Sequence, residues 1–345
     1  MTLQELCQQK TNITIGYLGG SITEQKEYRQ AVDALLRQAY PQTTFTDINA
    51  GVGGTNSFLG GSRAQRDLLA HKPDIVVVEF SGNDSGGYQG DFSIFGRALE
   101  GIFRKVLRQN PHALLLCFGL TAEAMNQNGY AQGKDPESVV TPRAVAEHYH
   151  VPFINAGKAL YDHITARQIP IRELLPDTVH LNEAGGKFYG EQLFSVLSTH
   201  DFQCSIPTAP LYANHLEGIS LLMAEAFADA NWTLSHCTLY DRLPNYIYCF
   251  QPEQELTIPF RGTALGIYCT TEKDSGILCY RIDGGEWQER STWDKYCLKF
   301  NRAHDYILAA DLPDGEHTVT LKVSPQKDDL SEGYYIRIGA FLCAF

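Results

Sequence analysis

The sequence has no long hydrophobic run. A helix that crosses a membrane needs about 20 consecutive apolar residues, and no stretch of the 345 residues approaches that length. Residues 1–10 are polar and lack the apolar core that a signal peptide carries. We therefore expect a protein that does not span a membrane and is not secreted, and we expect a cytoplasmic location.

Positive charge is also scarce. The chain has 28 lysines and arginines against 40 aspartates and glutamates, which gives a formal net charge of -12 at pH 7. Such a surplus of negative charge repels nucleic-acid phosphates and anionic lipids. We expect neither a nucleic acid nor a membrane as partner, while the charge leaves the oligomeric state open.

Signatures of metals, disulfides and nucleotide cofactors are missing as well. The nine cysteines are scattered and form no CxxC pair, a pattern that favours reduced thiols over a disulfide framework. There is no HExxH helix, no P-loop, and no GxGxxG after an apolar run. We expect no metal and no cofactor.

Length and periodicity indicate two domains. A chain of 345 residues is longer than one core usually serves. Up to about residue 200, short apolar runs alternate with segments of helical spacing, which is typical of repeated βα units and of a parallel sheet covered by helices on both faces. We expect an α/β domain over residues 1–204, with strands at residues 13–18, 44–49, 74–80, 113–118 and 151–155.

The pattern of apolar and turn-forming residues changes after residue 204. Residues 205–210 contain two prolines and suggest a linker, and residues 214–228 have helical spacing. Further on, short runs are separated by turn signals such as Asp283-Gly284-Gly285, which indicates an antiparallel β-sandwich of jelly-roll type. We expect an accessory β-sandwich domain over residues 205–345, with a leading helix. Its three tryptophans suit either sugar stacking or a core: Trp232, Trp287 and Trp293.

One short stretch has the character of a catalytic turn. Gly19-Gly20-Ser21-Ile22-Thr23 follows the first apolar run and precedes a segment of helical spacing. Two glycines permit a tight turn and leave the hydroxyl uncrowded, and a serine at the carboxyl end of a sheet strand is placed as a nucleophile is placed. The alternative is structural, because Ser21 and Glu24 have the spacing of a helix capping box.

Polar groups stand at other predicted strand ends of this domain. Acyl transfer needs a hydroxyl nucleophile, a base, a carboxylate that orients the base, and donors for the oxyanion. The backbone N–H groups of Ser21 and Gly54 and the amide of Asn83 are candidate donors, and Asp177 and His180 are a candidate carboxylate and base. Asn83 could instead be a turn residue, and Asp177 with His180 could be a surface pair or metal ligands.

The Asp-x-x-His spacing occurs twice. Asp314 and His317 have the same sequence spacing as Asp177 and His180, but Asp314-Gly315 is typical of a hairpin turn. We therefore assign the second copy to structure. The GxSxG elbow of α/β-hydrolases is absent, because Thr23 stands where its second glycine belongs.

Four short blocks in this order resemble those of the SGNH hydrolases, also called the GDSL family. The resemblance spans about residues 12–200, and the blocks are Gly19–Thr23, Gly51–Gly54, Ser81–Asp84 and Asp177–His180. The first block has Gly-Gly-Ser where the family name has Gly-Asp-Ser, a variant that looks familiar among the carbohydrate esterases of the family.

The resemblance implies a fold and a set of roles. The fold would be a three-layer, flavodoxin-like parallel sheet. Ser21 would be the nucleophile, His180 the base and Asp177 the carboxylate that orients it. Gly54 and Asn83 would complete the oxyanion hole with the backbone N–H of Ser21. Gly53 is the less favoured donor, because the family uses the last glycine of its block.

The expected function is therefore that of a serine esterase. It would remove short acyl groups, most simply acetyl, from a small-molecule or oligosaccharide ester, through an acyl-enzyme at Ser21. The first alternative is a lipid esterase or thioesterase of the same fold, which the polar character of residues 119–135 disfavours. The second is a non-catalytic glycan-binding protein.

Overall fold

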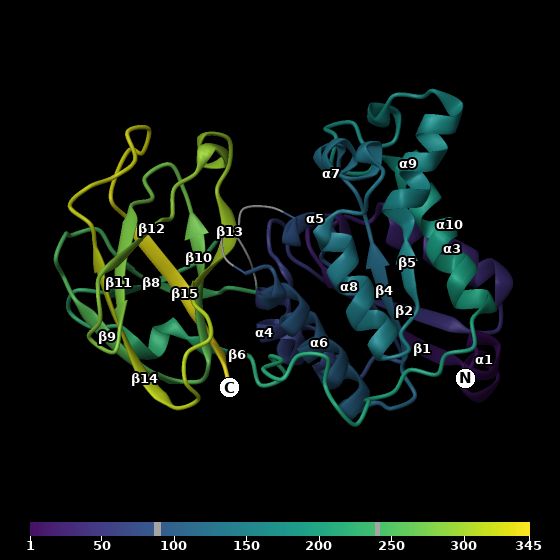
Figure 1. The fold of residues 1–345 in the computed structure, drawn as a ribbon, viewed down its shortest axis with the longest axis horizontal. Coiled ribbons are helices and arrows are strands. Elements are labelled where there is room, and N and C mark those ends of the chain that lie inside the picture. Colours follow the sequence, from purple (N-terminus) through teal and green to yellow (C-terminus); the bar gives the residue numbers. More distant parts are fainter. Residues whose placement is uncertain (86–90, 239–241) are drawn as a thin grey trace. The chain divides into compact units, whose positions relative to one another are not determined.

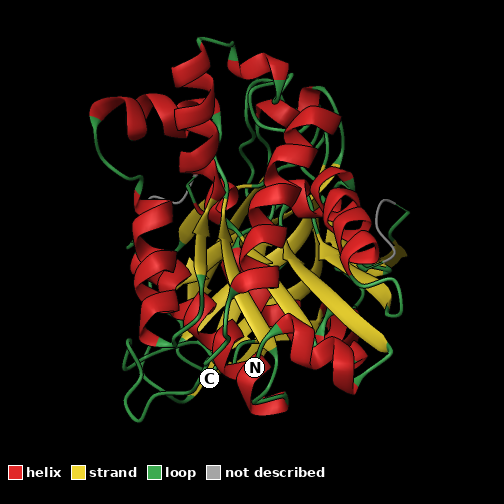
Figure 2. Ribbon diagram, turned by 90° about the vertical axis from the view of Figure 1, so that its right-hand side faces the viewer, coloured by secondary structure: helices red, strands yellow, loops and turns green. Residues whose placement is uncertain are grey.

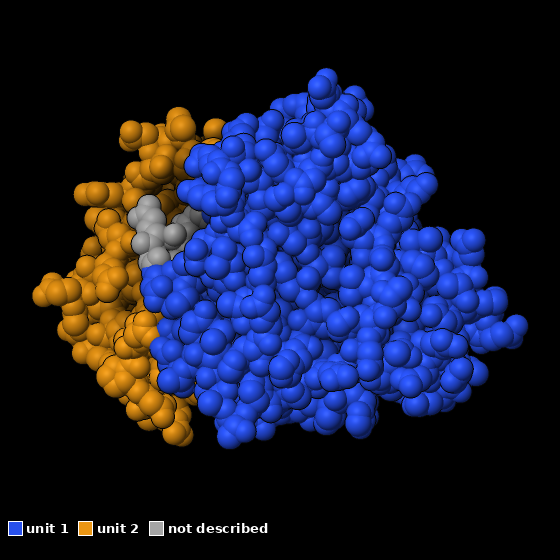
Figure 3. All heavy atoms as spheres, turned by 45° about the vertical axis from the view of Figure 1, so that its right-hand side comes forward, with its two compact units in different colours: residues 1–217 blue, residues 218–345 orange. Residues whose placement is uncertain are grey.

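The computed structural model describes residues 1–85, 91–238 and 242–345. The chain divides into two compact units, residues 1–217 and residues 218–345 (Figure 3). The first is an α/β unit and the second a β-sandwich, as the sequence predicted.

The α/β unit is built on a parallel five-stranded sheet with the order β2-β1-β3-β4-β5 (Figure 1). This is the order of flavodoxin-like folds, in which ligands bind at the carboxyl ends of the strands. The predicted fold class is confirmed. The strands are β1 (Asn12–Gly19), β2 (Thr44–Gly51), β3 (Ile75–Glu79), β4 (Leu114–Gly119) and β5 (Phe153–Asn155).

Helices cover both faces of this sheet, because successive strand side chains point to opposite faces. In β3, Ile75 and Val77 join the core beneath α3, α9 and α10, whereas Val76 and Val78 join the core beneath α4, α6 and α8. Figures 1 and 2 show these helices lying over the strands. The helices are α1 (Leu3–Gln9), α2 (Ser21–Glu24), α3 (Glu27–Ala39), α4 (Ser57–Asp67), α5 (Ser81–Asp84), α6 (Ser93–Gln109), α7 (Glu123–Asn128), α8 (Glu137–His148), α9 (Ala156–Arg167) and α10 (Glu183–Thr199), with short 3₁₀ turns η1 (Leu69–His71), η2 (Tyr130–Gln132) and η3 (Ile171–Glu173).

Strand register brings three strand ends to one level. Gly19, the last residue of β1, pairs with Gly51 at the end of β2 and with Glu79 at the end of β3. The turns that follow these strands therefore start side by side at the carboxyl edge of the sheet. Two of them are the one-turn helices α2 and α5, and the third is the glycine loop after β2.

The segment after α10 packs on the α/β unit instead of serving as a free linker. The buried carboxylate of Glu100 accepts the backbone N–H groups of Leu211 and Tyr212 over 2.7 and 2.8 Å. Arg104 pairs with Glu217 over 2.6 Å. These bonds explain why the compact units divide after residue 217, whereas we expected the domain boundary after residue 204.

The second unit consists of two antiparallel sheets around one core. One sheet has the order β13-β10-β15-β8-β7, with β6 also paired to β15, and the other has the order β12-β11-β14-β9. The strands are β6 (Ser220–Met223), β7 (Thr233–His236), β8 (Asn245–Cys249), β9 (Leu256–Arg261), β10 (Ala264–Thr271), β11 (Ile277–Ile282), β12 (Gln288–Ser291), β13 (Arg302–Ala309), β14 (Glu316–Val323) and β15 (Ile336–Ala344), with 3₁₀ turns η4 (Ala224–Phe227) and η5 (Lys295–Leu298).

Our prediction of a leading helix over residues 214–228 is wrong. Residues 220–223 form β6, and residues 224–227 form a 3₁₀ turn. The strand forms because Ser220 to Met223 pair with β15, the last strand of the chain. The spacing of apolar residues within a segment does not show whether a strand distant in the sequence will pair with it.

Two of the three tryptophans of this unit belong to its interior. Trp232 is fully buried and Trp293 nearly so. Trp287 is half-buried, with the guanidinium of Arg281 and the ammonium of Lys322 each 4.5 Å from its ring. Trp232 and Trp293 are therefore not available for sugar stacking, and the ring of Trp287 is engaged by two cationic side chains.

Within the described residues, no helix combines the length and the apolar character that a membrane span requires.

Candidate active site

The turn after β1 presents the Ser21 hydroxyl toward the carboxyl edge of the sheet. Gly20 occupies the N-cap position of α2, and no side chain caps this helix. A Cβ atom on Gly20 would lie 2.0 Å from Oδ1 of Asn83, so only glycine allows the two turns to approach so closely. Glu24 bonds to Gly53 instead of capping α2. The structure therefore contains no capping box at Ser21.

The side chains of Ser21, His180 and Asp177 form one chain of hydrogen bonds. Oγ of Ser21 lies 2.9 Å from Nε2 of His180, and Nδ1 of His180 lies 2.7 Å from Oδ2 of Asp177. An Nδ1–H that donates to the carboxylate leaves Nε2 free to accept the Ser21 proton. The three groups have the arrangement that nucleophilic acyl transfer uses.

Hydrogen bonds to backbone groups fix the loop that carries Asp177 and His180. Oδ1 of Asp177 accepts the N–H groups of Val179 and His180 over 3.0 and 2.7 Å. Thr178 has a φ of 73°, a left-handed conformation that is unfavourable for a β-branched residue and is found where the surroundings enforce it. Its carbonyl accepts the N–H of Glu123, the first residue of α7, over 2.9 Å.

These bonds determine the charge of Asp177. Partial burial would raise the pKa of the carboxyl, but hydrogen bonds from the backbone and ring of His180 and from the backbone of Val179 outweigh it and lower the pKa to about 2. The group is therefore a carboxylate at neutral pH. It stays available to hold the Nδ1–H tautomer of His180 and to stabilise the ring when it gains a proton.

The glycine loop after β2 lies against the nucleophile. A Cβ atom on Gly53 would lie 3.5 Å from Cβ of Ser21. The N–H of Gly53 donates to the Glu24 carboxylate over 2.9 Å, so this donor is engaged. Gly54 follows with a φ of 73°, a conformation that glycine adopts at little cost. The structure thus brings the turns of Ser21, Gly54 and Asn83 to the same edge of the sheet.

Three supporting residues escaped the sequence analysis. Arg63, fully buried in α4, donates to the carbonyls of Gly19 over 3.1 Å and of Ala50 over 2.6 Å, and so joins the ends of β1 and β2. Arg29 of α3 donates to the carbonyl of Thr23 over 2.8 Å. Glu79 accepts the Thr23 hydroxyl over 3.2 Å.

Local patterns reveal little of these supports. Arg63 bonds to carbonyls that are 13 and 44 positions away in the chain, and no short pattern encodes such a pairing. Glu79 did leave a signal, because it is a charged residue inside the apolar run of residues 74–80.

The second Asp-x-x-His copy has a different partner. Nδ1 of His317 lies 2.6 Å from Oδ2 of Asp283, and Nε2 lies 2.8 Å from the carbonyl oxygen of Pro313. The hydrogen bond to Asp283, followed by that to Pro313, raises the pKa of His317. Both ring nitrogens are occupied, so His317 cannot serve as a base toward a hydroxyl. It is a strand residue that ties β14 to the Asp283 turn.

Metal ligation and disulfide bonding find no support among the described residues. No group of three or more histidine, cysteine, aspartate or glutamate side chains could hold a metal ion there, and all nine cysteines are free thiols.

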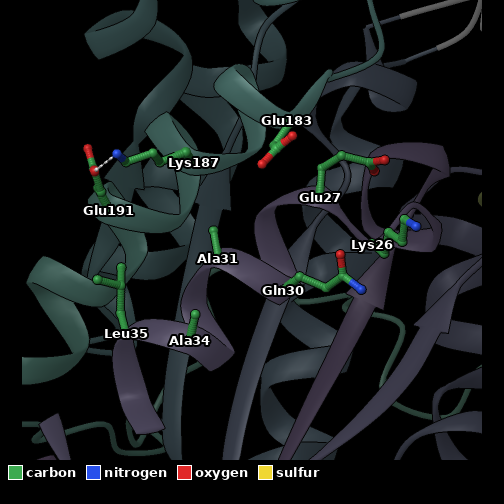
Figure 4. Close-up of a pocket in the computed structure, with 9 residues that line it drawn as sticks. All are labelled: Lys26, Glu27, Gln30, Ala31, Ala34, Leu35, Glu183, Lys187 and Glu191. Atoms are coloured by element: carbon green, nitrogen blue, oxygen red, sulfur yellow. Dashed lines mark ion pairs between the residues drawn. The ribbon is translucent and has the colours of Figure 1, made fainter. Parts of the chain in front are cut away.

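A hollow of about 580 Å³ lies between α3 and α10 (Figure 4), and none of the triad residues lines it. Ala31, Ala34 and Leu35 contribute its apolar part, and charged side chains such as Glu183 and Lys187 surround it. Its lining contains no serine, histidine or cysteine, and we assign it no part in the chemistry.

Comparison with known proteins agrees with this architecture. No curated protein matches the chain. Among solved structures, a two-domain esterase (CEX) active on acetylated mannans, co-crystallised with mannopentaose, superimposes with a TM-score of 0.81 at 21% identity, covering 99% of this chain and 93% of that one. A second structure of that esterase gives 0.81 at 22% identity, covering 99% and 94%. A catalytic mutant of Axe2, an acetylxylan esterase from Geobacillus stearothermophilus, gives 0.47 at 17% identity, covering 55% and 95%.

The two-domain esterase shares the fold of this chain, and a sequence profile establishes the family. The profile of the GDSL-like lipase/acylhydrolase family matches residues 13–188, just over half of the 345 residues. The matched segment contains all four blocks that the sequence analysis singled out, together with the hydrogen-bonded serine, histidine and aspartate. The chain belongs to the GDSL-like lipase/acylhydrolase family and is an ester hydrolase of the SGNH type.

Proposed function

We propose that the protein is a serine esterase that removes short acyl groups, most simply acetyl, from carbohydrate through an acyl-enzyme at Ser21. The observation that carries the proposal is the 2.9 Å contact between Oγ of Ser21 and Nε2 of His180, backed by the Asp177 carboxylate. Serine, base and carboxylate in this order supply a nucleophile at neutral pH without a metal.

The steps follow from the positions of these groups. Nε2 of His180 takes the Ser21 proton while Oγ attacks the ester carbonyl, and the negative charge develops on the carbonyl oxygen. The backbone N–H groups of Ser21 and Gly54 and the amide of Asn83 stabilise that oxyanion. His180 returns the proton to the departing sugar oxygen. It then activates a water molecule that hydrolyses the acyl-enzyme.

The carbohydrate preference rests on two supports. The two-domain esterase that shares this fold over 99% of the chain is described as active on acetylated mannans. In this chain, Ser85, the residue after α5, is one of the residues lining a hollow of about 470 Å³, which combines apolar side chains such as Phe92 and Met125 with polar ones such as Asn128 and Lys134. A mixed lining suits a hydroxylated leaving group better than a long acyl chain.

A substrate panel tests the proposal. We expect the parent protein to cleave p-nitrophenyl acetate faster than the butyrate and octanoate, to release acetate from acetylated manno-oligosaccharides, and to lose both activities in Ser21→Ala. A preference for octanoate or for acyl thioesters would indicate the lipid esterase or thioesterase alternative. Oligosaccharide binding without hydrolysis of any ester would indicate a glycan-binding protein.

A further inference from the structure

A buried carboxyl group lies beneath the catalytic turns. Glu79 is the last residue of β3, and only 2% of its surface is exposed. The four preceding residues of the strand are apolar and buried, and they join the two cores of the unit. A carboxyl group at such a position is unfavourable unless hydrogen-bond donors surround it.

The donors come from two turns. From the turn after β1, the Thr23 hydroxyl lies 3.2 Å from Oε2 of Glu79, and the backbone N–H of Gly20 also donates a hydrogen bond to the carboxylate. From the turn after β3, the backbone N–H groups of Ser81 and Gly82 donate hydrogen bonds to the same carboxylate. Gly20 and Thr23 flank Ser21, and Ser81 and Gly82 immediately precede Asn83, so one carboxylate joins the turns of both residues.

The two turns have little room to shift independently. A Cβ atom on Gly19 would lie 2.5 Å from the carbonyl oxygen of Glu79, and one on Gly20 would lie 2.0 Å from Oδ1 of Asn83. The turns are therefore in direct contact above the Glu79 side chain. A small displacement of either would move the nucleophile relative to the oxyanion donor, and a misplacement of about 1 Å can lower a rate by about 100-fold.

We propose that Glu79 is a positioning residue that holds the Ser21 turn and the Asn83 turn in one arrangement, and that it does so best as a carboxylate. The proposal rests on the esterase function proposed above. A carboxylate accepts hydrogen bonds at both oxygens, whereas a neutral carboxyl or amide group replaces one acceptor by a donor. That donor would face N–H and O–H groups that also donate.

The ionisation of Glu79 falls in an accessible pH range. Burial raises its pKa to about 7, against the opposing hydrogen bonds from Thr23, Gly82, Gly20 and Ser81. Burial also raises the pKa of three neighbouring groups far above that range, so they stay neutral: the hydroxyls of Tyr28 and Tyr189 and the thiol of Cys117. The charged groups on the adjoining helices include Glu24 of α2, Arg29 of α3, Arg63 of α4 and Asp84 of α5.

The test compares Glu79→Gln with the parent on p-nitrophenyl acetate between pH 5.5 and 8.5. At pH 8 we expect kcat to be lower by about 10- to 100-fold with KM little changed, because the loss is one of alignment in the transition state. Toward pH 5.5 the parent itself becomes protonated at Glu79. The ratio of the parent's kcat/KM to that of the variant should therefore fall toward 1, and any effect of His180 cancels in this ratio.

A matched control is available in the same unit. Glu100 is also fully buried, and it accepts the N–H groups of Leu211 and Tyr212 and the Tyr149 hydroxyl. None of these partners belongs to the turns that carry Ser21 or Asn83. Glu100→Gln should leave kcat and its pH dependence unchanged. As a second probe, Thr23→Val should lower kcat and Thr23→Ser, which keeps the hydroxyl, should restore it.

The outcomes separate the two proposals. A ratio that stays constant with pH, or an equal loss of kcat in Glu100→Gln, would overturn the role of Glu79. Full activity of both Glu79→Gln and Thr23→Val, with Ser21→Ala inactive, would overturn it while leaving the esterase function intact. Unchanged hydrolysis by Ser21→Ala would overturn both.

Discussion

The backbone N–H of Gly53 donates to the Glu24 carboxylate over 2.9 Å, and this bond ties the glycine loop after β2 to the turn that carries Ser21. Glu24 also accepts, through its own carbonyl oxygen, the side-chain amide of Asn49 over 3.0 Å. The loop is therefore held on both sides of Gly51. The residue after Gly53 is the proposed oxyanion donor Gly54, so the bond to Glu24 restrains the loop directly before that donor.

Removal of this bond should weaken catalysis without abolishing it. We expect Glu24→Ala to lower kcat by about 10-fold, less than the 10²–10³ that follows deletion of an oxyanion donor, because Gly54 remains present but less well placed. Glu24→Gln keeps an oxygen acceptor and should stay near the parent. Steady-state kinetics on p-nitrophenyl acetate measure both, and equal losses in the two variants would show that charge matters more than the bond.

Ser21→Ala should fold normally and lose nearly all esterase activity. The Ser21 hydroxyl bonds to His180 and caps no helix, so its loss should not bring the 0.5–2 kcal/mol of destabilisation that loss of a cap causes. Melting curves by circular dichroism and turnover of p-nitrophenyl acetate measure the two effects. Mass spectrometry after treatment with a serine-reactive phosphonate should place the adduct on Ser21. An active but destabilised variant would contradict the nucleophile assignment.

Asn83→Ala should lower kcat by roughly 10²–10³ with little change in KM, because an oxyanion donor acts mainly in the transition state. Gly20→Ala gives an independent check on the same side chain, since its new Cβ would lie 2.0 Å from Oδ1 of Asn83 and displace it. Both variants should retain binding of a substrate analogue. An effect confined to KM in Asn83→Ala would argue for a substrate contact instead of an oxyanion donor.

The two Asp-x-x-His copies should behave differently. His180→Ala should abolish turnover, whereas His317→Ala, which loses bonds to Asp283 and Pro313, should keep kcat within a few-fold of the parent. Asp177→Asn should lower kcat by up to about 10⁴, the effect known for a serine-protease triad. The loss should be smaller here, because the Asp177 side chain is 58% exposed and water can replace part of its interaction. The reverse ranking of the two histidines would place the site elsewhere.

Glu79 should also leave a mark on stability. Folding raises its pKa from 4.5 to about 7, so between these values the folded protein holds a proton that the unfolded chain has released, and stability falls as pH rises. At 1.36 kcal/mol per pH unit, the parent should lose about 3 kcal/mol of unfolding free energy relative to Glu79→Gln between pH 4.5 and pH 7. Urea unfolding of both proteins across this range measures the difference, and a difference independent of pH would contradict the raised pKa.

Much of the architecture was predictable because it depends on short-range patterns. Alternating apolar runs and helical segments identified the five parallel strands, and glycine turns identified the antiparallel unit. Gly19 and Gly20 mark the turn at Ser21 for a local reason, since a side chain would not fit there. Residues 214–228 were misassigned because their strand exists only through pairing with β15.

The residue types and their order along the chain were thus determined by the sequence by itself: Ser21 after the first strand, Asn83 after the third, and Asp177 three residues before His180. Only the tertiary structure decided which of them meet. Ser21 and His180 are 159 positions apart, and strand order and register bring them within hydrogen-bonding distance. The same physics gave His317 the partner Asp283 instead of Asp314 and placed Glu79 beneath both turns, because side-chain contacts follow the packing of strands and not their spacing in the chain.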